Sequence, residues 1–277
     1  MIPEKILEDA AELVRQGDQA SAVEALEEGL NAFPDDQNIL NNLGCLLLED
    51  DQFDRALDLL SRAYEIDENN VDVASNYGYA LIHMGEVTIA RGVYERILAD
   101  KPDHIESINH LALIAAFSGN FQEALEYYEK ALSLAPQDVR ILNNYGSTLR
   151  KTGRFSEALR VLKKAHKLAP QDVEVLGNLA SAYIRLRDYM VAERYLEIAI
   201  EISPDDALSH YQLGTRFREE FVEKRADRSA DKEYLRYLVH RARSSFNKYL
   251  ELTRDYYYED YVNYWLEELD KGMKDLR

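Results

Sequence analysis

The sequence predicts an all-α fold in which one pair of helices is repeated along the chain. The stretch LAPQDV occurs at residues 134–139 and again at residues 168–173, which places the two copies 34 residues apart. Alanine recurs at the same interval, at Ala22, Ala56, Ala90, Ala124, Ala158 and Ala192. A fixed period of this length is typical of one supersecondary unit that stacks against its own copies.

Apolar residues inside each period follow the spacing of two amphipathic helices. The periods are numbered from slot 1, which falls at Pro3, Gln37, Val71, Ile105, Val139 and Val173. Slots 4, 7, 8 and 11 are three or four residues apart, so they form one face of a first helix, helix A. Slots 20, 24 and 27 form the corresponding face of a second helix, helix B. Small residues at slots 8 and 20 predict a close approach of the two backbones.

Helix-breaking residues mark the ends of both helices. Slot 15 holds a glycine in four periods, which predicts a turn between helix A and helix B: Gly17, Gly85, Gly119 and Gly153. Slot 32 holds a proline in five periods: Pro34, Pro102, Pro136, Pro170 and Pro204. Proline cannot continue helix B because it lacks a backbone N–H. In the second period Glu68 replaces the proline, and the polar run IDENN ends the helix instead.

Together these slots resemble the tetratricopeptide repeat family, which combines small residues at slots 8 and 20 with a proline at slot 32. Six complete repeats cover residues 3–206. The family's tryptophan is missing from slot 4, which holds other apolar residues: Ile6, Leu40, Ala74, Ile108, Leu142 and Leu176. The resemblance implies a right-handed superhelical solenoid, with the A helices on its concave side and the B helices on its convex side.

A seventh repeat with an insertion is expected at residues 207–256. Its helix A keeps the pattern at Leu213 and Gly214. The apolar face of its helix B returns 16 residues later than the period requires, at Ala242, Phe246 and Tyr249. The polar stretch before that face is rich in helix formers, so we expect both helices of this pair to be longer.

A C-terminal capping helix is expected at residues 257–277, because a repeat array needs a last element that covers its final apolar face. Its apolar and aromatic residues are Tyr258, Tyr261, Tyr264, Trp265 and Leu269. We expect this face to pack on the seventh repeat. The alternative is an exposed aromatic patch that docks a partner.

Charge and hydropathy narrow the classes of function. The net charge of −18 argues against nucleic acid as the partner. No apolar run of 18 residues is present, so no membrane insertion is expected. The first residues lack the pattern of a secretory signal, and the single cysteine, Cys45, forms no internal disulfide. Both observations favour a cytoplasmic location.

The sequence holds no pattern of a catalytic, cofactor or metal site. It contains no P-loop, no G-x-G-x-x-G and no H-E-x-x-H motif. The six histidines have no metal-ligand spacing, and none lies at the depth of Cys45 in the expected groove. We therefore predict that the protein is not an enzyme and that it uses no cofactor or metal.

A row of amides is expected along the concave surface. Slot 6 of repeats two to seven holds a polar side chain each time: Asn42, Asn76, His110, Asn144, Asn178 and Gln212. Amides both donate and accept hydrogen bonds, so such a row can pair with the backbone of an extended peptide. The row resembles the asparagine ladder in the tetratricopeptide repeat region of O-linked N-acetylglucosamine transferase. The alternative is that these side chains brace adjacent helices.

Other groove positions predict a ligand of mixed character. Apolar side chains are expected in the middle of the groove, at Tyr79, Leu113 and Phe117. Basic side chains that favour carboxylates follow at Arg140, Arg150, Lys151, Arg185 and Arg218. The slots do not match the carboxylate clamp of the Hsp70 and Hsp90 co-chaperones, so binding of chaperone tails is not predicted.

Repeat five is basic in an acidic chain. Residues 139–172 contain eight basic and two acidic residues, a net charge of +6, whereas repeats one and two carry −8 and −6. Half of the basic residues are expected on the outer face of helix B: Arg160, Lys163, Lys164 and Lys167. They form either a solvated face or a docking patch for an acidic surface, such as that of a second copy.

These observations predict a protein-interaction module, an adaptor or assembly factor. It binds an extended peptide or a helix of another protein in the concave groove. The alternative is a scaffold that self-associates, with acidic repeats one and two against basic repeat five.

Overall fold

The protein is all-α, as the helical spacing predicts. The computed structural model describes residues 2–227, 229–253 and 258–275, which form fifteen helices and no strand. Within these residues no helix is both long and apolar enough to cross a membrane. The chain divides into two compact units, unit 1 with residues 1–135 and unit 2 with residues 136–277.

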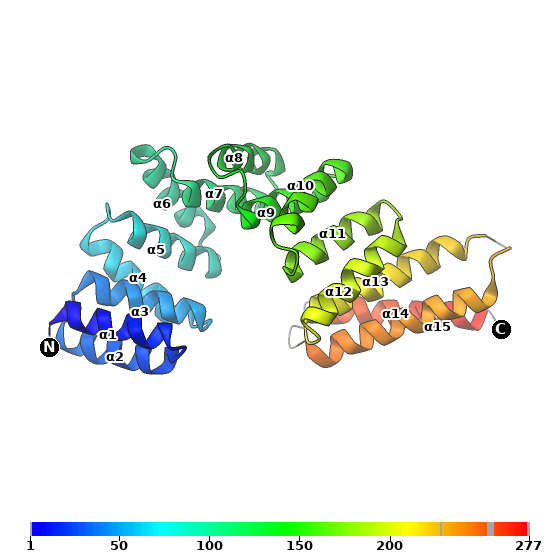
Figure 1. The fold of residues 1–277 in the computed structure, drawn as a ribbon, viewed down its shortest axis with the longest axis horizontal. Helices are drawn as coiled ribbons and strands as arrows, with labels where there is room; N and C mark the ends of the chain where they lie inside the picture. The colour runs from blue at the N-terminus through cyan, green and yellow to red at the C-terminus, as the bar shows by residue number, and fades with distance from the viewer. Residues whose placement is uncertain (1, 228, 254–257, 276–277) are drawn as a thin grey trace. The chain divides into compact units, whose positions relative to one another are not determined.

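Unit 1 consists of four helix pairs, each with a 13-residue helix A and a 14-residue helix B (Figure 1). The A helices are α1 (Pro3–Arg15), α3 (Gln37–Glu49), α5 (Val71–His83) and α7 (Ile105–Phe117). The B helices are α2 (Gln19–Ala32), α4 (Phe53–Ile66), α6 (Val87–Asp100) and α8 (Phe121–Leu134). Every A helix of unit 1 runs from slot 1 to slot 13, so the period of the sequence is also the period of the helices.

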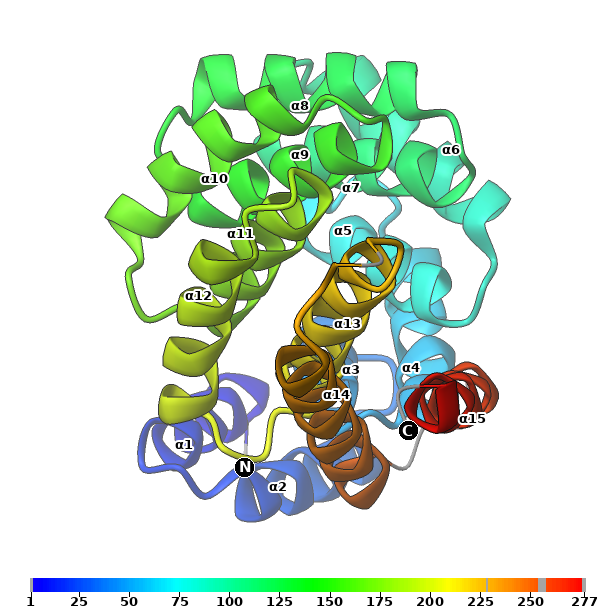
Figure 2. The same ribbon diagram turned by 90° about the vertical axis from the view of Figure 1, so that its right-hand side faces the viewer.

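Unit 2 repeats these lengths in two pairs and then departs from them. Its regular helices are α9 (Val139–Lys151), α10 (Phe155–Leu168), α11 (Val173–Arg185) and α12 (Tyr189–Ile202). They are followed by α13 (Ala207–Lys224), α14 (Lys232–Leu252) and α15 (Glu259–Asp275). Helices α13 and α14 run side by side (Figures 1 and 2) and are 18 and 21 residues long, so the inserted residues extend both. The right-handed superhelix stays a prediction.

The helices of a pair meet through a small residue at slot 8 and a large residue at slot 24. In repeat two a Cβ added to Gly44 would lie 2.6 Å from Leu60 Cγ, and in repeat five one added to Gly146 would lie 2.5 Å from Leu162 Cγ. The alanines at slot 20 are fully buried: Ala22, Ala56, Ala90, Ala124, Ala158 and Ala192. Small residues are needed at slot 8 because the facing side chain leaves no room for another.

The same contact identifies helix B of repeat seven. A Cβ on Gly214 would lie 2.5 Å from Phe246 Cδ1, and both Ala242 and Phe246 are fully buried. Phe246 is therefore the structural equivalent of the slot-24 residue in the regular repeats. The apolar face lies where the shift of 16 residues predicts it.

Helix α15 covers repeat seven with one face. Val262 and Leu269 are buried, and the Trp265 ring lies 5.5 Å from the Phe246 ring. The Tyr258 ring, just before α15, lies 4.9 Å from the Tyr211 ring of α13, but Tyr261 and Tyr264 are exposed. The capping helix is confirmed, but the expectation that all of its aromatic residues pack inward is wrong. Residues 262, 265 and 269 follow the helical spacing of three and four, which turns positions 261 and 264 away from the packed face.

The turn from helix A to helix B needs a left-handed backbone at slot 15. The four glycines of this slot have φ between 78° and 80°. Asp51 and Arg187 stand there in repeats two and six, with φ of 57° and 62°. A left-handed residue that has a side chain costs about 1–2 kcal/mol. The turn is therefore imposed by the packing of the helix pair, whichever residue occupies the slot.

Each A helix from repeat two onward begins with a side-chain cap, which the apolar periodicity does not reveal. Asp36 accepts hydrogen bonds from the backbone N–H groups of Asn38 and Ile39, both at 3.0 Å. The caps of the later A helices occupy the same slot: Asn70, His104, Asp138, Asp172 and Asp206. Such caps satisfy backbone donors that have no partner inside the helix.

A buried ion cluster joins α12, α13 and α14. Arg216 is 3% exposed, and its guanidinium lies 2.7 Å from Glu193 and 2.9 Å from Glu220. Arg241 of α14 approaches the same Glu193 carboxylate at 3.5 Å. Buried charges are costly unless they are paired. The cluster therefore favours one arrangement of the lengthened helices over others.

Candidate functional site

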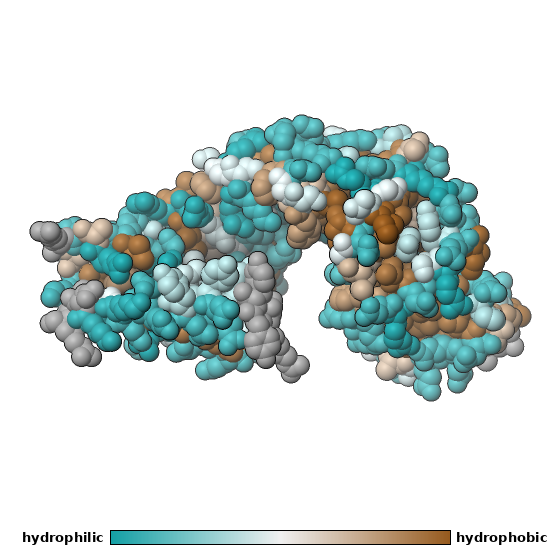
Figure 3. Space-filling model, turned by 180° about the vertical axis from the view of Figure 1, so that it is seen from behind, coloured by the Kyte–Doolittle hydropathy of each residue, from teal (hydrophilic) through white to brown (hydrophobic). Residues whose placement is uncertain are grey.

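On the face shown in Figure 3, hydrophobic residues lie in small areas between hydrophilic ones. No single large apolar area on this face indicates a binding site. In unit 1 the predicted apolar groove residues are accessible: Tyr79 and Phe117 are exposed, Phe117 to 72%, and Leu113 is half-buried. These side chains can offer apolar contacts to a partner.

His110 does not lie on this surface, so the prediction that it lines the groove is wrong. It is 4% exposed, and its ring stacks on the Tyr94 ring at 4.9 Å. Its Nε2 lies 3.7 Å from a carboxylate oxygen of Glu106. Tyr94 comes from α6, helix B of the preceding repeat, so the imidazole is part of the core of unit 1.

The amides at slot 6 connect adjacent A helices. In unit 1 Asn76 Nδ2 donates a hydrogen bond to Asn41 Oδ1 at 2.9 Å. In unit 2 Asn178 Nδ2 donates to Asn143 Oδ1, also at 2.9 Å. Both bonds join residues 35 positions apart, from slot 6 of one repeat to slot 5 of the preceding one. Bracing is therefore present in both units, and Asn76 and Asn178 use only an N–H group for it.

The other polar side chains of the row differ from one another. Asn42 is exposed and Asn144 is half-buried. Gln212 is half-buried, and its Oε1 lies 2.8 Å from the position that a Cβ on Gly177 would occupy. The Gln212 amide therefore lies directly over the backbone of α11.

A pocket of about 420 Å³ on the A helices of unit 2 brings five predicted residues together. These are Arg150, Lys151, Asn178, Arg185 and Gln212. The other described residues that line it are Ser147, Ser181, Ile184, Leu208, Tyr211, Thr215 and Tyr258. None of these twelve residues is acidic. The pocket therefore concentrates positive charge and hydrogen-bond donors on the expected binding surface.

The electrostatics of the pocket favour an anionic ligand. Burial lowers the pKa of Arg150, and the positive charge of Arg185 lowers it further. Burial and the Arg150 charge lower the pKa of Lys151 in the same way. Among the described residues no carboxylate forms an ion pair with Arg150 or Arg185. An anion in the pocket would relieve the repulsion between these cations.

Two of the predicted basic residues lie outside the pocket. Arg140 is exposed on α9. Arg218 is 2.8 Å from the Glu219 carboxylate, and its guanidinium lies over the Trp265 ring at 4.7 Å. The structure thus gathers three of the five basic side chains.

Hydroxyl groups are the part of the pocket that the sequence analysis missed. Slot 9 holds Ser147, Ser181 and Thr215 in three consecutive repeats, and all three line the pocket. Their signal was a row of small polar residues at one slot. Tyr211 was also missed; burial raises its pKa to about 12, and the neighbouring Tyr258 and Tyr249 contribute.

The outer patch predicted on α10 is exposed at all four positions, Arg160, Lys163, Lys164 and Lys167. Lys164 has a structural contact, since its Nζ donates to the backbone oxygen of Pro136 at 2.6 Å. Lys130 makes the same bond to Pro102 in unit 1, also at 2.6 Å, across the same 28 residues. Lys164 therefore secures the turn before its own repeat, and Lys163 Nζ lies 5.5 Å from the centre of the Tyr183 ring, so two of the four residues have contacts within the fold.

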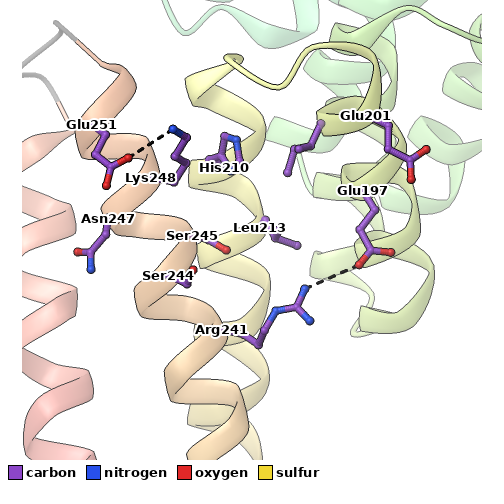
Figure 4. Close-up of a pocket in the computed structure, with 11 residues that line it drawn as sticks. Glu197, Glu201, His210, Leu213, Arg241, Ser244, Ser245, Asn247, Lys248 and Glu251 are labelled. Carbon is purple, nitrogen blue, oxygen red and sulfur yellow. Dashed lines mark hydrogen bonds and ion pairs between the residues drawn. The ribbon is translucent and has the colours of Figure 1, made fainter.

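A larger cleft of about 900 Å³ lies between α12, α13 and α14 (Figure 4). Its basic residues are directed toward its own acidic ones: Arg241 is 3.7 Å from Glu197, and Lys248 is 3.3 Å from Glu251. Because these charges are already paired, the cleft offers less to a charged ligand than the smaller pocket does.

The surroundings of Cys45 do not activate its thiol as a nucleophile. Burial raises the pKa of the Cys45 thiol to about 11, and the nearby Glu49 carboxylate contributes. The thiol is therefore protonated at neutral pH. No group of three His, Cys, Asp or Glu side chains among the described residues could hold a metal ion.

Comparison with protein families gave three matches. Residues 2–138 match the family described as the cytochrome c-type biogenesis protein H TPR domain. Residues 109–173 and 149–213 match two families described as tetratricopeptide repeat. Together the matches run from residue 2 to residue 213. A comparison with curated protein sequences found no significant match.

Solved structures share the fold at low sequence identity. A tetratricopeptide repeat protein from Parabacteroides merdae ATCC 43184 superposes with a TM-score of 0.71 at 20% identity, over 96% of this chain and 98% of its own. A chain of the APC/C hetero-tetramer Cut9–Hcn1 gives 0.75 at 16% identity, over 94% of this chain and 48% of its own. Human IFIT1, in a dimer with m7Gppp-AAAA, gives 0.65 at 18% identity, over 95% and 64%. These identities show the fold alone.

Proposed function

Because this chain belongs to the tetratricopeptide repeat family, we propose that it is a non-catalytic adaptor or assembly factor that binds a segment of another protein on its A helices. Proteins of this family are in general protein-interaction modules. In unit 2 the segment lies across α9, α11 and α13 and places an acidic group in the pocket. A cytoplasmic location stays a prediction from the sequence.

The observation that carries this proposal is a basic pocket on an acidic chain, with no acidic side chain among the described residues that line it. A chain of net charge −18 brings Arg150, Lys151 and Arg185 to one pocket lined by no described acidic residue. Like charges held this close repel one another, which costs free energy unless an anion compensates them. A partner that carries negative charge at this point supports such an arrangement.

The amide row serves both helix packing and binding in this proposal. Asn178 uses one N–H to brace α11 against Asn143. Its Oδ1 and its second N–H remain for the backbone of the bound segment. These amide groups bind the backbone of the segment whatever its sequence. The pocket and the apolar residues around it then select the side chains.

Selection from a random-peptide display library with the full chain tests the proposal. We expect the selected peptides to carry acidic residues and to lose about tenfold to hundredfold in affinity for the Arg150→Gln, Arg185→Gln double variant. The matched control is Lys163→Gln with Lys167→Gln, which removes two charges from the outer face of α10. Peptides that bind the first variant as tightly as the wild type, but not the control, would place the site on α10 instead.

The uneven distribution of charge supports a second candidate, a self-associating scaffold. Repeats one and two carry −8 and −6, and repeat five carries +6. Arg160, Lys163 and Lys167 are exposed on α10 and could meet the acidic repeats of another copy. Contacts of this kind are screened within about 8 Å at physiological ionic strength. Light scattering that finds a monomer at both low and high salt would exclude the scaffold.

A further inference from the structure

The pocket on α9, α11 and α13 combines two kinds of hydrogen-bond donor. Basic side chains stand at slots 12 and 13, at Arg150, Lys151 and Arg185. Hydroxyls stand at slot 9 of the same face, at Ser147, Ser181 and Thr215. The chain has 51 acidic residues, yet none of the described residues that line the pocket is one of them. Arginine clusters with neutral donors beside them are typical of sites that bind oxyanions.

We infer that this pocket binds a phosphorylated serine or threonine side chain of the partner segment. The inference rests on the proposed function, because the phosphate is carried by the segment that lies on the A helices.

Charge and donor number favour a phosphate over a carboxylate. A phosphorylated side chain carries a charge of about −1.5 to −2 and three strong acceptor oxygens. A carboxylate carries one charge and two oxygens, which leaves one of the two charges of Arg150 and Arg185 without compensation. The fork of each guanidinium matches two oxygens of a phosphate. The lowered pKa of Arg150, caused by burial and by Arg185, agrees with a site prepared for a doubly charged ligand.

The hydroxyls add donors that a phosphate can use. Thr215 Oγ1 already donates to the backbone oxygen of Tyr211 at 3.0 Å. Ser147 and Ser181 are half-buried, and their hydroxyl protons can turn toward an oxygen in the pocket. Two arginines, one lysine and two serines supply enough donors for all three oxygens.

The surroundings of the pocket favour a peptide over a nucleic acid. Ile184, Leu208 and Tyr258 line the same pocket and offer apolar contacts to the residues beside the phosphate. Asn178 offers its amide to a peptide backbone. The net charge of −18 repels a polyanion at longer range, whereas one phosphate on a short segment meets mainly the local positive charge.

The test uses three degenerate peptide libraries that differ at one fixed central residue, phosphoserine, serine or glutamate. Binding to the full chain is measured by fluorescence anisotropy. We expect the phosphoserine library to bind at least about tenfold tighter than the glutamate library, because charged hydrogen bonds to the extra oxygen are lost. The Arg150→Gln, Arg185→Gln variant should lose this preference, and the Lys163→Gln, Lys167→Gln variant should keep it.

A second variant covers the case in which removal of half-buried Arg150 disturbs the fold. Arg185 is exposed, so Arg185→Lys keeps the charge and the fold but removes the guanidinium fork. It should reduce the preference for phosphoserine, and circular dichroism should show an unchanged helix content.

The outcomes separate this inference from the proposed function. If the phosphoserine and glutamate libraries bind equally well, and both lose binding in the arginine variants, the inference of a phosphate site is wrong. The pocket is then a site for acidic peptides, as the proposed function states. Binding of no library to the wild type overturns the proposed function at this pocket as well. Tighter binding of a 5′-phosphorylated RNA oligonucleotide, competing with the phosphoserine library, also overturns the inference.

Discussion

Single residues in this chain adopt conformations that the repeat imposes on them. Asp51 takes the left-handed backbone that glycine takes in four of the six regular repeats, with φ of 57°. Its side chain is exposed, and no packing contact explains why aspartate stands there. Position 51 therefore carries a conformational cost that a glycine would remove.

We expect Asp51→Gly to stabilise the protein by about 0.5–1 kcal/mol, because relief of the left-handed strain exceeds the entropy that glycine adds to the unfolded chain. The midpoint of urea unfolding, followed by circular dichroism, measures the change. Gly153→Ala is the matched control, since it introduces the same strain at the corresponding slot of repeat five and should lower the midpoint. A lower midpoint for Asp51→Gly would contradict the argument.

The single cysteine reports on burial in unit 1. The pKa of Cys45 rises from 9.0 to about 11, mainly through burial. At a pH below both pKa values, the thiolate fraction of Cys45 is about a hundredfold smaller than that of an exposed cysteine. A thiolate of higher pKa is more nucleophilic, which raises the alkylation rate again by about a factor of ten. Alkylation by iodoacetamide at pH 8 should therefore be about tenfold slower than in the urea-unfolded chain. The rate should rise about tenfold per pH unit up to about pH 11, and equal rates in both states at pH 8 would refute the shift.

At the scale of whole elements, α15 is a packed helix with one exposed side. Leu269 is 2% exposed, whereas Tyr264 on the same helix is 56% exposed. We expect Leu269→Ala to lower the free energy of unfolding of unit 2 by about 2–5 kcal/mol, through lost burial and a cavity. Tyr264→Ala should change it by less than about 0.5 kcal/mol. Thermal melts of the two variants decide whether α15 is a cap. If the two changes are equal, α15 does not pack as described.

The regular helices could be predicted from the sequence because each slot is sampled six times. Alanine at slot 20 and the proline at slot 32 recur often enough to place both helices within each repeat. Helix α15 occurs once, so aromatic residues could not be assigned to its packed or exposed side. The slot-9 hydroxyls form a row of small polar residues at one slot, but such a row does not indicate a binding site until the structure shows that the side chains share a pocket. His110 was misplaced because Tyr94 leaves it a buried stacking position that no other slot-6 residue takes.

At the scale of the whole molecule, nearly all of the net charge belongs to one unit. Residues 1–135 contain 8 basic and 27 acidic residues, and residues 136–277 contain 25 basic and 24 acidic residues. Unit 1 therefore carries a net charge of −19 and unit 2 a net charge of +1. A high net charge of one sign destabilises a folded unit through self-repulsion. The two units should consequently differ in how they respond to salt.

We expect added sodium chloride to stabilise unit 1 and to leave unit 2 nearly unchanged. Screening shortens the Debye length from about 30 Å at 0.01 M salt to about 8 Å at 0.15 M, which weakens repulsion between surface carboxylates of unit 1. In unit 2 salt screens attractions and repulsions in similar numbers, so the two effects offset each other. Hydrogen exchange followed by mass spectrometry resolves the units, because protection factors of core helices report their opening free energies. Protection should rise severalfold in α4 and α6 between the two salt concentrations, with α10 and α12 as internal controls. An equal rise of protection in both units would mean that the response comes from general salting-out of apolar surface. No rise in either unit would mean that ion pairs such as Arg91 with Glu123, at 2.9 Å, already compensate the acidic surface of unit 1.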